Sequence, residues 1–266
     1  MKAVTTALTI AGSDSSGGAG IQADLKTFAA FGLYGTCAIT AITAQNTTGV
    51  VESFPLSADL VTAQIEAVAG DVPPKATKIG MLANAAIVEA VAAAIEALDL
   101  PLVVVDPVML STSGARLLDD DGLQMLRAEL LPRCTATTPN IPEAEALSGR
   151  VIASIEDARA AARQIYETGG AAVIIKGGHA TGNQIVDLLY DGNVFTEIQT
   201  TRINTPHTHG TGCTFASAVA ANLALGRSLT DSMVHAQEYV AGAIQHAFEI
   251  GHGHGPLDHF WKIRSG

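Results

Sequence analysis

The sequence predicts an α/β fold in which a mostly parallel β-sheet carries helices on both faces. Short apolar, strand-forming runs alternate with longer alanine-rich stretches of helical period along most of the 266 residues. After Lys176 this alternation stops, and Asp191-Gly192, a dipeptide that tight hairpin turns favour, separates two further strand-like runs. We therefore expect a parallel sheet with an antiparallel hairpin at one edge.

Each expected element follows from its local pattern. The strands of the parallel part are short apolar runs that end at a polar residue or a glycine: residues 7–11, 36–44, 76–80, 102–106, 136–139 and 172–176. The helices between them have apolar residues at helical spacing: residues 21–31, 58–69, 85–98, 121–130, 143–147 and 155–168. The hairpin strands would span 185–190 and 194–200. Two helices, about 212–225 and 229–250, would complete the fold, and their alanine content favours close helix packing.

The composition predicts one folded domain spanning residues 1–266. Hydrophobic residues make up 48% of the chain and charged residues 15%, which excludes a disordered protein, and no linker-like run divides the sequence. No uninterrupted apolar stretch reaches the roughly 18 residues of a membrane span. The polar segment that follows residue 11 argues against a signal peptide.

Charge and cysteine usage restrict the classes of partner. The net charge of -11 argues against general binding to nucleic acid or to a membrane surface, because both are polyanionic. Cys37, Cys134 and Cys213 are too few and too scattered for a disulfide framework. We therefore expect a reducing, cytoplasmic location and a small-molecule partner.

Polar residues and glycines follow six of the expected strands. Ligands of open parallel sheets bind beyond the carboxyl ends of the strands. Each residue alone has an ordinary explanation as a turn or a helix cap, but six groups at one edge favour a ligand site. The groups are Gly12-Ser13-Asp14, Gln45-Asn46, Met81, Asp106, Asn140 with Glu143, and Lys176-Gly177-Gly178.

The glycine-rich loop of residues 12–20 joins the first strand to the first helix. Its glycine spacing differs from the dinucleotide-binding fingerprint, and no Gly-Lys-Ser/Thr of a P-loop follows. Either the loop simply caps the helix, or its backbone amides approach a small ligand; we favour the second interpretation. Asp24, in the following helix, either complements the helix dipole or accepts a hydrogen bond in the pocket.

The segment of residues 208–214 lies immediately before an apolar helix. Gly210, Thr211 and Gly212 would leave backbone amides at the positive end of that helix, where anionic oxygens bind. Cys213 would lie in the first turn, where the helix dipole lowers the pKa of a thiol. A buried structural cysteine is the alternative, but it leaves the glycines unexplained. We therefore predict a catalytic role for Cys213.

Two further groups suggest a nucleotide. Asn140 and Glu143 either cap a helix or, with Asp106, offer oxygen ligands to a Mg²⁺ that nucleotide phosphates complete. Lys176 is either solvated or a phosphate contact. A metal site at His207-Thr208-His209 or His252-Gly253-His254 is disfavoured, because neither pair has partner ligands at helical spacing.

Eight segments in order carry a resemblance to a known family. They are AGSDSSGGAGIQADLKT (11–27), TAQN (43–46), KIGML (78–82), VDPVM (105–109), TPNIPEAE (138–145), IKGGH (175–179), HGTGCT (209–214) and GHGHGP (251–256). Together they resemble the hydroxymethylpyrimidine/phosphomethylpyrimidine kinases of thiamine biosynthesis, which belong to the ribokinase-like superfamily. The resemblance implies a ribokinase-like fold, a homodimer, and ATP-dependent phosphorylation of 4-amino-5-hydroxymethyl-2-methylpyrimidine, first to the monophosphate and then to the diphosphate.

The resemblance also implies roles for individual residues. Gln45 would read the aminopyrimidine edge, since its amide both donates and accepts. The pyrimidine pocket would be lined by Gly12, Asp24, Met81 and Val108. Asn140, Glu143 and, from nearby, Asp106 would serve ATP and Mg²⁺, and Lys176 would contact phosphate. Gly210, Thr211 and Gly212 would form an anion hole, and Cys213 would be the general base in the place where most sugar kinases of the superfamily carry Asp.

Three other functions stay open at this point. A pyridoxal or pyridoxine kinase of the same superfamily is the closest, although residues 107–114 lack the second cysteine that some of those enzymes carry in a lid. A non-catalytic pyrimidine- or nucleotide-binding module would not need the intact residues 210–213. A hydrolase using Cys213 and His209 would need an orienting partner. We expect residues of about 110–118 to act as a mobile lid.

Overall fold

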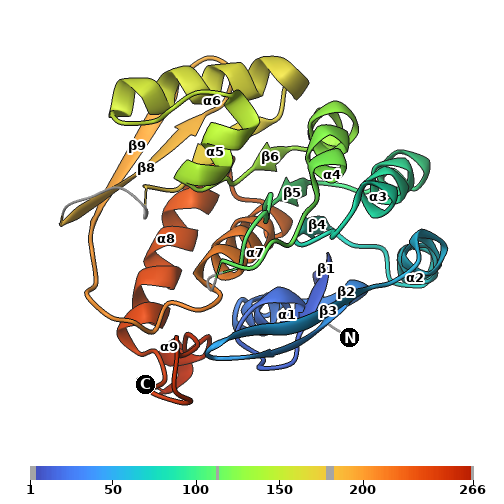
Figure 1. Ribbon diagram of the computed structural model, residues 1–266, viewed down its shortest axis with the longest axis horizontal. Coiled ribbons are helices and arrows are strands. Elements are labelled where there is room, and N and C mark those ends of the chain that lie inside the picture. Colours follow the sequence, from blue (N-terminus) through green and yellow to red (C-terminus); the bar gives the residue numbers. More distant parts are fainter. Residues whose placement is uncertain (1–3, 112–113, 178–182, 265–266) are drawn as a thin grey trace.

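The computed structural model describes residues 4–111, 114–177 and 183–264. Within these ranges nine strands form one sheet, in the order β3-β2-β1-β4-β5-β6-β7-β8-β9 (Figure 1). The strands are β1 (Thr6–Asp14), β2 (Tyr34–Asn46), β3 (Gly49–Pro55), β4 (Ala76–Ile79), β5 (Val103–Val105), β6 (Ala136–Thr137), β7 (Ala172–Ile175), β8 (Gln184–Tyr190) and β9 (Phe195–Thr201). Of the predicted functional segments, Thr112 and Ser113 of the expected lid and Gly178 lie outside the described residues.

The six central strands are parallel, as predicted, and both edges are antiparallel. The hairpin at Asp191-Gly192 is confirmed, with Tyr190 opposite Phe195. The opposite edge strand, β3, was not predicted. Its residues are nearly all exposed, so they lack the apolar alternation by which a half-buried strand is recognised. Its turn is built by Asn46, whose Oδ1 accepts hydrogen bonds from the backbone of Thr48 and Gly49.

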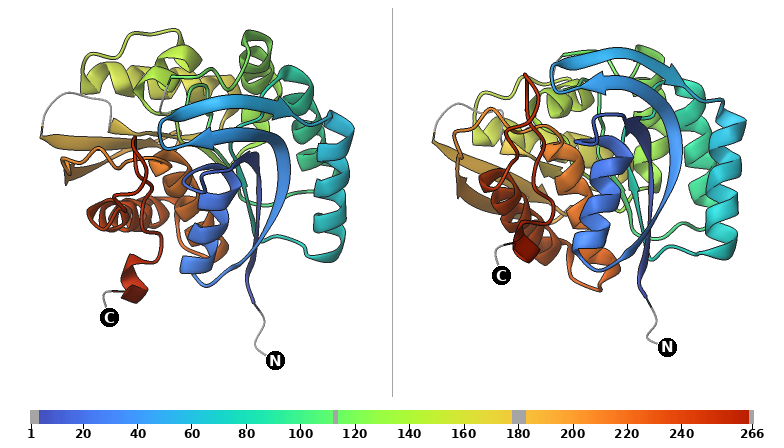
Figure 2. Two further views of the ribbon diagram at one scale, coloured as in Figure 1. Left: turned by 60° about the horizontal axis from the view of Figure 1, so that its bottom comes forward. Right: turned by 90° about the horizontal axis from the view of Figure 1, so that it is seen from below.

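Helices cover both faces of the sheet (Figures 1 and 2). They are α1 (Gly20–Ala30), α2 (Ala58–Asp71), α3 (Ala85–Ala97), α4 (Asp120–Met125), the π-helix η1 (Leu126–Leu130), the 3₁₀-helix η2 (Leu131–Arg133), α5 (Ile141–Ser148), α6 (Ile155–Gly169), α7 (Thr211–Ala224), α8 (Leu229–Gln245) and α9 (Trp261–Arg264). Two predicted helices differ. The helix expected at 121–130 divides into α4 and η1, and the one expected to reach residue 250 ends at Gln245, where the chain turns so that Phe248 donates to the carbonyl of Pro256.

The two faces of the sheet form two apolar cores. Because successive strand residues point to opposite faces, Leu8 and Ile10 of β1 pack into the core under α2, α3 and α6, whereas Ala7 packs into the core under α1, α7 and α8. Val103 and Val105 of β5 likewise face the first core and Val104 the second. This alternation explains why uninterrupted apolar runs such as residues 103–105 are strands of a sheet buried on both faces.

The strand order reverses between β1 and β4, and a ligand site is expected at this point of the sheet. In open parallel sheets a ligand crevice forms where the connections diverge. Here Gly80 donates to the carbonyl of Ile10 at 3.0 Å, and a Cβ at Gly12 would lie only 2.8 Å from Met81 Sδ. Gly12 therefore lets the ends of β1 and β4 approach closely. No helix in the part of the chain that the structure describes is long and apolar enough to cross a bilayer.

Candidate active site

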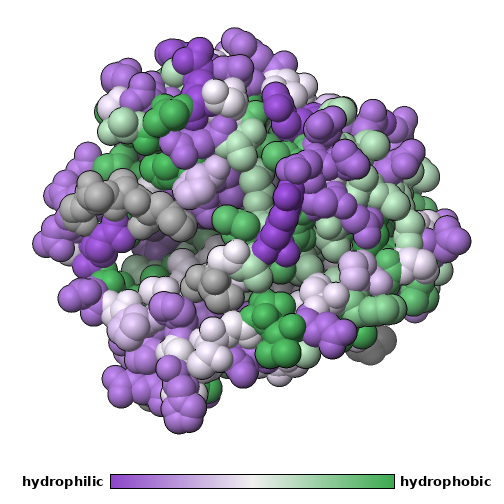
Figure 3. Space-filling view, viewed as in Figure 1, coloured by the Kyte–Doolittle hydropathy of each residue, from purple (hydrophilic) through white to green (hydrophobic). Residues whose placement is uncertain are grey.

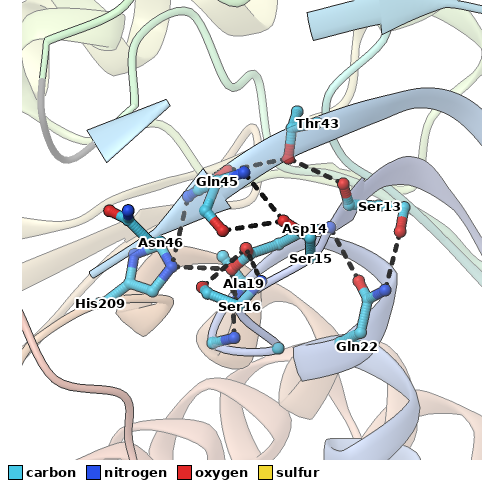
Figure 4. Close-up of polar contacts among 12 residues, drawn as sticks. Ser13, Asp14, Ser15, Ser16, Ala19, Gln22, Thr43, Gln45, Asn46 and His209 are labelled. Atoms are coloured by element: carbon cyan, nitrogen blue, oxygen red, sulfur yellow. Dashed lines mark hydrogen bonds and ion pairs between the residues drawn. The ribbon is translucent and has the colours of Figure 1, made fainter. Parts of the chain in front are cut away.

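The glycine-rich loop is organised by the carboxylate of Asp14, at the end of β1. Asp14 Oδ1 accepts from the backbone and the hydroxyl of Ser16 at 2.8 and 2.7 Å, and Oδ2 accepts from the backbone of Gly18 and Ala19 at 3.1 and 2.8 Å (Figure 4). Although burial raises the pKa of Asp14, the hydrogen bonds from His209 and Ser16 lower it well below its usual range. The loop is thus a turn held around a buried anion, not a flexible cap.

His209 joins this loop to the start of α7. Its Nε2 lies 2.8 Å from Asp14 Oδ2 and 3.4 Å from Gln45 Nε2, so the ring stands between two strand ends (Figure 4). A Cβ at Gly18 would lie 2.3 Å from the His209 ring, and Gly18 is therefore required for the contact. The ends of β1 and β2 and the beginning of α7 consequently form one connected cluster.

Gln45 lies half-buried at the end of β2. Its backbone N–H donates to Ser15 Oγ and its carbonyl accepts from the same hydroxyl, both at 2.8 Å, while Thr43 Oγ1 lies 3.1 Å from its side-chain oxygen. These contacts fix the residue beside the glycine-rich loop. The structure thus brings Gln45 to the glycine-rich loop and to His209 at the start of α7, as expected for residues at one edge of the sheet (Figure 4).

α7 begins without a side-chain cap. Its N-cap, Gly210, has a left-handed φ of 86° and makes no side-chain capping bond; α1 also begins without one. By contrast α2, α3, α5, α6 and α8 are all capped by a side chain. A Cβ at Gly210 would lie 1.8 Å from the carbonyl oxygen of Gly18, so only glycine fits there. The first turn of α7 therefore has no side-chain cap next to the glycine-rich loop, and the Thr211 N–H donates to the Thr208 carbonyl at 3.2 Å.

Cys213 lies in this first turn and is half-buried, but its ionisation differs from the prediction. Burial raises the pKa of Cys213 to about 11; Lys78 lowers the pKa, while Asp24 and Asp106 raise it. The helix dipole alone would lower the pKa of the thiol. In the structure, desolvation and two carboxylates outweigh the partial charge of the helix terminus.

Asp24 is also placed differently from the prediction. Its side chain is fully buried and pairs with Lys78, whose Nζ lies 2.9 and 2.8 Å from the two carboxylate oxygens. The hydroxyls of Thr9 and Ser217 each donate to Asp24 at 2.6 Å. Asp24 therefore lies beneath the site and presents no free oxygen to a pocket. Lys78 is the residue that the sequence analysis missed, since a lysine inside a strand gives no signal that its partner lies 54 positions earlier.

Asp106 and Lys176 form a second ion pair, at the ends of β5 and β7. Lys176 Nζ lies 2.7 Å from Asp106 Oδ1, and the lysine side chain is 14% exposed. A Cβ at Gly212 would lie 3.4 Å from both Asp106 Oδ2 and Lys176 Nζ, so the pair borders the first turn of α7. The turn after Lys176 is fixed by the buried Asp187, which accepts from the Gly177 backbone at 2.7 Å. The predicted Asp106 and Lys176 are thus adjacent to the predicted anion hole.

Asn140 and Glu143 form a capping box at the start of α5. Asn140 Oδ1 accepts from the Glu143 backbone at 2.9 Å, and Glu143 Oε2 accepts from the Asn140 backbone at 2.8 Å. Burial raises the pKa of Glu143 to about 7; Lys176 lowers it and Asp106 raises it. The two residues therefore do have the ordinary capping role, and Glu143 is in addition a buried acid close to the Asp106–Lys176 pair.

The remaining predicted residues lie around this edge. Met81 is buried, and its carbonyl accepts from Thr40 Oγ1 at 2.6 Å. Val108 is half-buried and follows Asp106, with its backbone N–H on the Asp106 carbonyl. Beyond it, Leu110 and Arg116, both in the expected lid, form an isolated antiparallel bridge.

Apart from His209, two histidines of the disfavoured pairs, His207 and His254, make side-chain contacts with the backbone. His254 Nδ1 lies 2.8 Å from the carbonyl of Pro206, and His207 Nδ1 accepts from the Gly255 backbone at 3.1 Å. These contacts tie the C-terminal loop to the segment before α7, while Thr47 receives the backbone N–H groups of His252 and His254, so the loop lies against the β2–β3 turn (Figure 2). Among the residues described, no group of three His, Cys, Asp or Glu side chains is arranged to hold a metal.

Comparison with known proteins gives the family. A sequence model of the family described as phosphomethylpyrimidine kinase matches residues 14–258. The chain belongs to the hydroxymethylpyrimidine/phosphomethylpyrimidine kinase family. It is 51% identical to the hydroxymethylpyrimidine/phosphomethylpyrimidine kinase of Bacillus subtilis, over 96% of this chain and 94% of that protein. It is 50% identical to the enzyme of the same name from Synechococcus elongatus, over 98% and 99%. A thiamine biosynthesis bifunctional protein of Geobacter sulfurreducens is 46% identical, over 95% of this chain and 51% of that protein.

Solved structures of the superfamily share the kinase fold. The pyridoxal kinase of Staphylococcus aureus in complex with AMP-PCP and pyridoxal superposes with a TM-score of 0.91 at 38% identity, over 99% of this chain and 96% of that one. The phosphomethylpyrimidine kinase of Clostridium difficile superposes with a TM-score of 0.81 at 42% identity, over 90% and 99%. The predicted fold class and the predicted kinase class are therefore confirmed.

Proposed function

We propose that this family member transfers the γ-phosphoryl group of ATP to the hydroxymethyl group of 4-amino-5-hydroxymethyl-2-methylpyrimidine, and then phosphorylates the monophosphate, in thiamine biosynthesis. The observation that carries the proposal is the cluster at the switch point of the sheet. There Gln45, the glycine-rich loop and the uncapped start of α7 are joined through His209. An amide that reads a heterocycle thus lies beside amides suited to a phosphoryl group.

The pyrimidine would bind between Gln45 and the ends of β1 and β4. Gln45 offers a donor and an acceptor, which suits the ring nitrogen and the exocyclic amino group of an aminopyrimidine. Gly12 and Met81 supply a closely packed floor, and Val108 an apolar side. Asp24 would support the floor of this pocket from beneath and would not contact the ring, because its oxygens are already bonded to Lys78, Thr9 and Ser217.

ATP would bind along the ends of β5, β6 and β7. Lys176, held by Asp106, is the cation placed to contact phosphate oxygens, and Asn140 begins the neighbouring helix. Mg²⁺ fits the donor set here. Asp106 raises the pKa of Glu143, so the two carboxylates lie within each other's field, and a divalent cation would relieve their repulsion. Glu143 and Asp106 would hold the ion with waters and phosphate oxygens, and it would supply charge neutralisation of the phosphates.

Transfer would take place at the start of α7. The N–H groups of Gly210 and Gly212 would stabilise charge on the transferring group, whereas the predicted third donor, the Thr211 N–H, already donates to the Thr208 carbonyl. Cys213 would take the hydroxyl proton as the substrate oxygen attacks, which requires the thiol to ionise from a pKa of about 11. Closure of the proposed lid, residues of about 110–118, over the site would exclude water, which otherwise hydrolyses ATP.

A pyridoxal kinase activity is the second candidate, and the TM-score of 0.91 with a pyridoxal kinase favours it. The higher identities, 51% and 50%, are with enzymes named for the pyrimidine. In a hydrolase, Asp14 could orient His209. However, Asp14 contacts Nε2, the same ring nitrogen that lies nearest Gln45, so this nitrogen is already engaged. Hydrolysis would also leave Lys176 and Glu143 without a role.

A coupled ADP-release assay tests the proposal with hydroxymethylpyrimidine, its monophosphate and pyridoxine as separate substrates. We expect turnover with the first two and at least about tenfold lower kcat/KM with pyridoxine, because a mismatched ring edge leaves polar groups of the site unpaired. Preference for pyridoxine would replace the proposed substrate, and absence of turnover with all three would favour a binding module.

We also place this enzyme in the cytoplasm as a homodimer. Its cysteines Cys37, Cys134 and Cys213 are free, in keeping with a reducing compartment. Apolar side chains are exposed on the β2–β3 edge, where Figure 3 shows hydrophobic surface; they are Ile42 (51%), Val51 (80%) and Phe54 (67%). Phe54→Glu should shift the mass measured by light scattering to that of a monomer. Ile263→Glu, at an equally exposed apolar residue of α9, should not.

A further inference from the structure

Two contacts one helical turn apart hold α1 and α7 side by side. The Gly20 backbone N–H lies near the Cys213 thiol and lowers its pKa, and Ser217 Oγ donates to Asp24 Oδ1 at 2.6 Å. Gly20 and Asp24 are four residues apart on α1, as are Cys213 and Ser217 on α7, so each pair lies on one face of its helix. The two helices therefore begin together, and Asp24 lies one turn below the thiol.

Lys78 reaches Asp24 from the sheet. On β4, Ala76 faces the core under α1 and α7 and Ile79 faces the other core, so the side chain of Lys78 points toward α1 and α7. Thr9 is the register partner of Lys78 on β1 and points the same way. Both side chains converge on Asp24, and the charged groups of Lys78 and Asp24 are 0% exposed.

The ammonium group of Lys78 lies at the carboxyl edge of its strand. A Cβ at Gly80 would be 2.7 Å from Nζ, so the charge lies directly against the backbone that leads to Met81. A buried ion pair is costly to form and is a weak source of stability compared with apolar side chains of the same size. Its position next to the reacting groups therefore calls for a role other than stability.

We propose that Lys78 is a positioning residue for the proton transfer, whose buried ammonium, held by Asp24 one helical turn from Cys213, favours the thiolate form of that cysteine. Lys78 acts through Cys213 and contacts no substrate. The ammonium is a full charge in buried surroundings, where charges interact more strongly than in water, whereas a helix terminus carries about half a charge. In agreement, Lys78 is the strongest influence that lowers the pKa of Cys213 against the effect of burial.

The charged groups around the thiol come from four elements. Lys78 on β4 and Lys176 after β7 favour the thiolate, whereas Asp24 on α1 and Asp106 after β5 oppose it. The catalytic consequence rests on the proposed function. The thiolate accepts the proton of the substrate hydroxyl, that oxygen bonds to the γ-phosphorus, and the bond from phosphorus to the leaving ADP oxygen breaks with its electron pair going to ADP. The thiol then returns its proton to water.

The test measures the thiol directly in the unliganded full-length protein. Iodoacetamide reacts with the thiolate, so the alkylation rate of Cys213 at pH 8.5, followed by mass spectrometry of its peptide, reports the thiolate fraction. Lys78→Met should slow alkylation by about ten- to hundredfold, the effect of losing a neighbouring charge. Asp24→Asn should not slow it. Ser217→Ala, which removes a contact and no charge, is the matched control and should stay within about threefold of the wild type.

A merely structural role predicts the opposite sign. Loosening the packing would expose the thiol and speed alkylation, so a rate for Lys78→Met equal to or above the wild type overturns the inference. If circular dichroism shows that this variant does not fold, the double variant Asp24→Asn/Lys78→Met, which removes both buried charges, is measured instead. Alkylation of the double variant at or below the wild-type rate supports the inference, and faster alkylation overturns it.

The kinase assay separates this inference from the proposed function. Slower alkylation together with a lower kcat and little change in the pyrimidine KM supports both. Slower alkylation with unchanged kcat supports the role of Lys78 toward the thiol and instead removes Cys213 as the base.

Discussion

His209 Nε2 lies 2.8 Å from the carboxylate of Asp14, and this contact joins two loops that are 195 residues apart in the sequence. The carboxylate also receives the backbone N–H groups of Ser16, Gly18 and Ala19. The carboxylate of Asp14 therefore determines the shape of the glycine-rich loop, and the imidazole of His209 fixes the position of the start of α7 relative to that loop.

Asp14→Asn should loosen this junction. An asparagine retains one acceptor oxygen, but its NH₂ group would face donors that now bind the second carboxylate oxygen. We expect a loss of about 2–4 kcal/mol in the free energy of unfolding, measured with urea, because buried donors are left unpaired. Ser13→Ala removes one bond, from Gln22, in the same loop and should cost about 1 kcal/mol; equal losses would contradict the central role of Asp14.

Gly210→Ala and Gly226→Ala form a matched pair. Both glycines have left-handed φ angles, 86° and 84°, but a Cβ at Gly210 would lie 1.8 Å from Gly18 O, whereas nothing lies within 4 Å at Gly226. Gly226→Ala should therefore cost only the backbone strain, about 1 kcal/mol. Gly210→Ala should cost at least about 3 kcal/mol by thermal or urea unfolding and should lower turnover, since the start of α7 must shift. Similar costs for the two would show that Gly210 is free to move.

Cys213→Ala tests the assigned base. The thiol lies near the Gly20 backbone N–H, which lowers its pKa, where the starts of α1 and α7 meet. Its removal should reduce kcat by about 10²- to 10⁴-fold, the usual effect of losing a positioned base. The affinity for the pyrimidine, measured by calorimetry, should change much less. Near-normal turnover would assign the proton transfer to another group.

Gln45→Ala tests substrate recognition. The side chain lies between Thr43 and His209 at the edge of the proposed pyrimidine pocket. Its loss should weaken binding of the aminopyrimidine by about 1–3 kcal/mol, because ring polar atoms are left unpaired. ATP binding should be nearly unaffected. An equal loss for both ligands would indicate that Gln45 serves the structure of the loop and not the ring.

The sequence allowed prediction of what depends on local pattern. Apolar runs located β1, β2 and β4 to β7, and the polar residues after them came together because parallel strands end at one edge. The exposed β3 gave no such pattern. For Asn140 and Glu143 the sequence left two alternatives open, a helix cap or oxygen ligands for Mg²⁺. Their spacing indicates the cap that the structure contains, but it does not show which other groups lie near it.

The errors concern groups whose environment depends on distant residues. The pKa of Cys213 was predicted to fall because the helix start is visible in the sequence, while the burial and the carboxylates of Asp24 and Asp106 are not. Asp24 was assigned to the pocket because nothing local shows that Lys78 will bind both of its oxygens. Such long-range ion pairs require the packed fold.

Glu143 provides a pH-dependent prediction. Burial raises its pKa from the ordinary 4.5 to about 7, so the folded protein holds this proton more tightly than the unfolded chain does. The stabilisation is complete below pH 4.5, decreases as the pH rises toward 7, and is absent above it. Glu143→Gln removes the titration and keeps the cap, because the glutamine oxygen still accepts from the Asn140 backbone.

The measurement is the free energy of unfolding in urea of both proteins between pH 4.5 and 8. At the acid end the two should agree, which is the internal control. With rising pH the wild type should lose up to about 2–3 kcal/mol relative to Glu143→Gln, and the difference should stop growing near pH 7. Parallel curves over the whole range would mean that Glu143 has the same pKa in the folded protein as in the unfolded chain, and that Lys176 offsets the effect of burial.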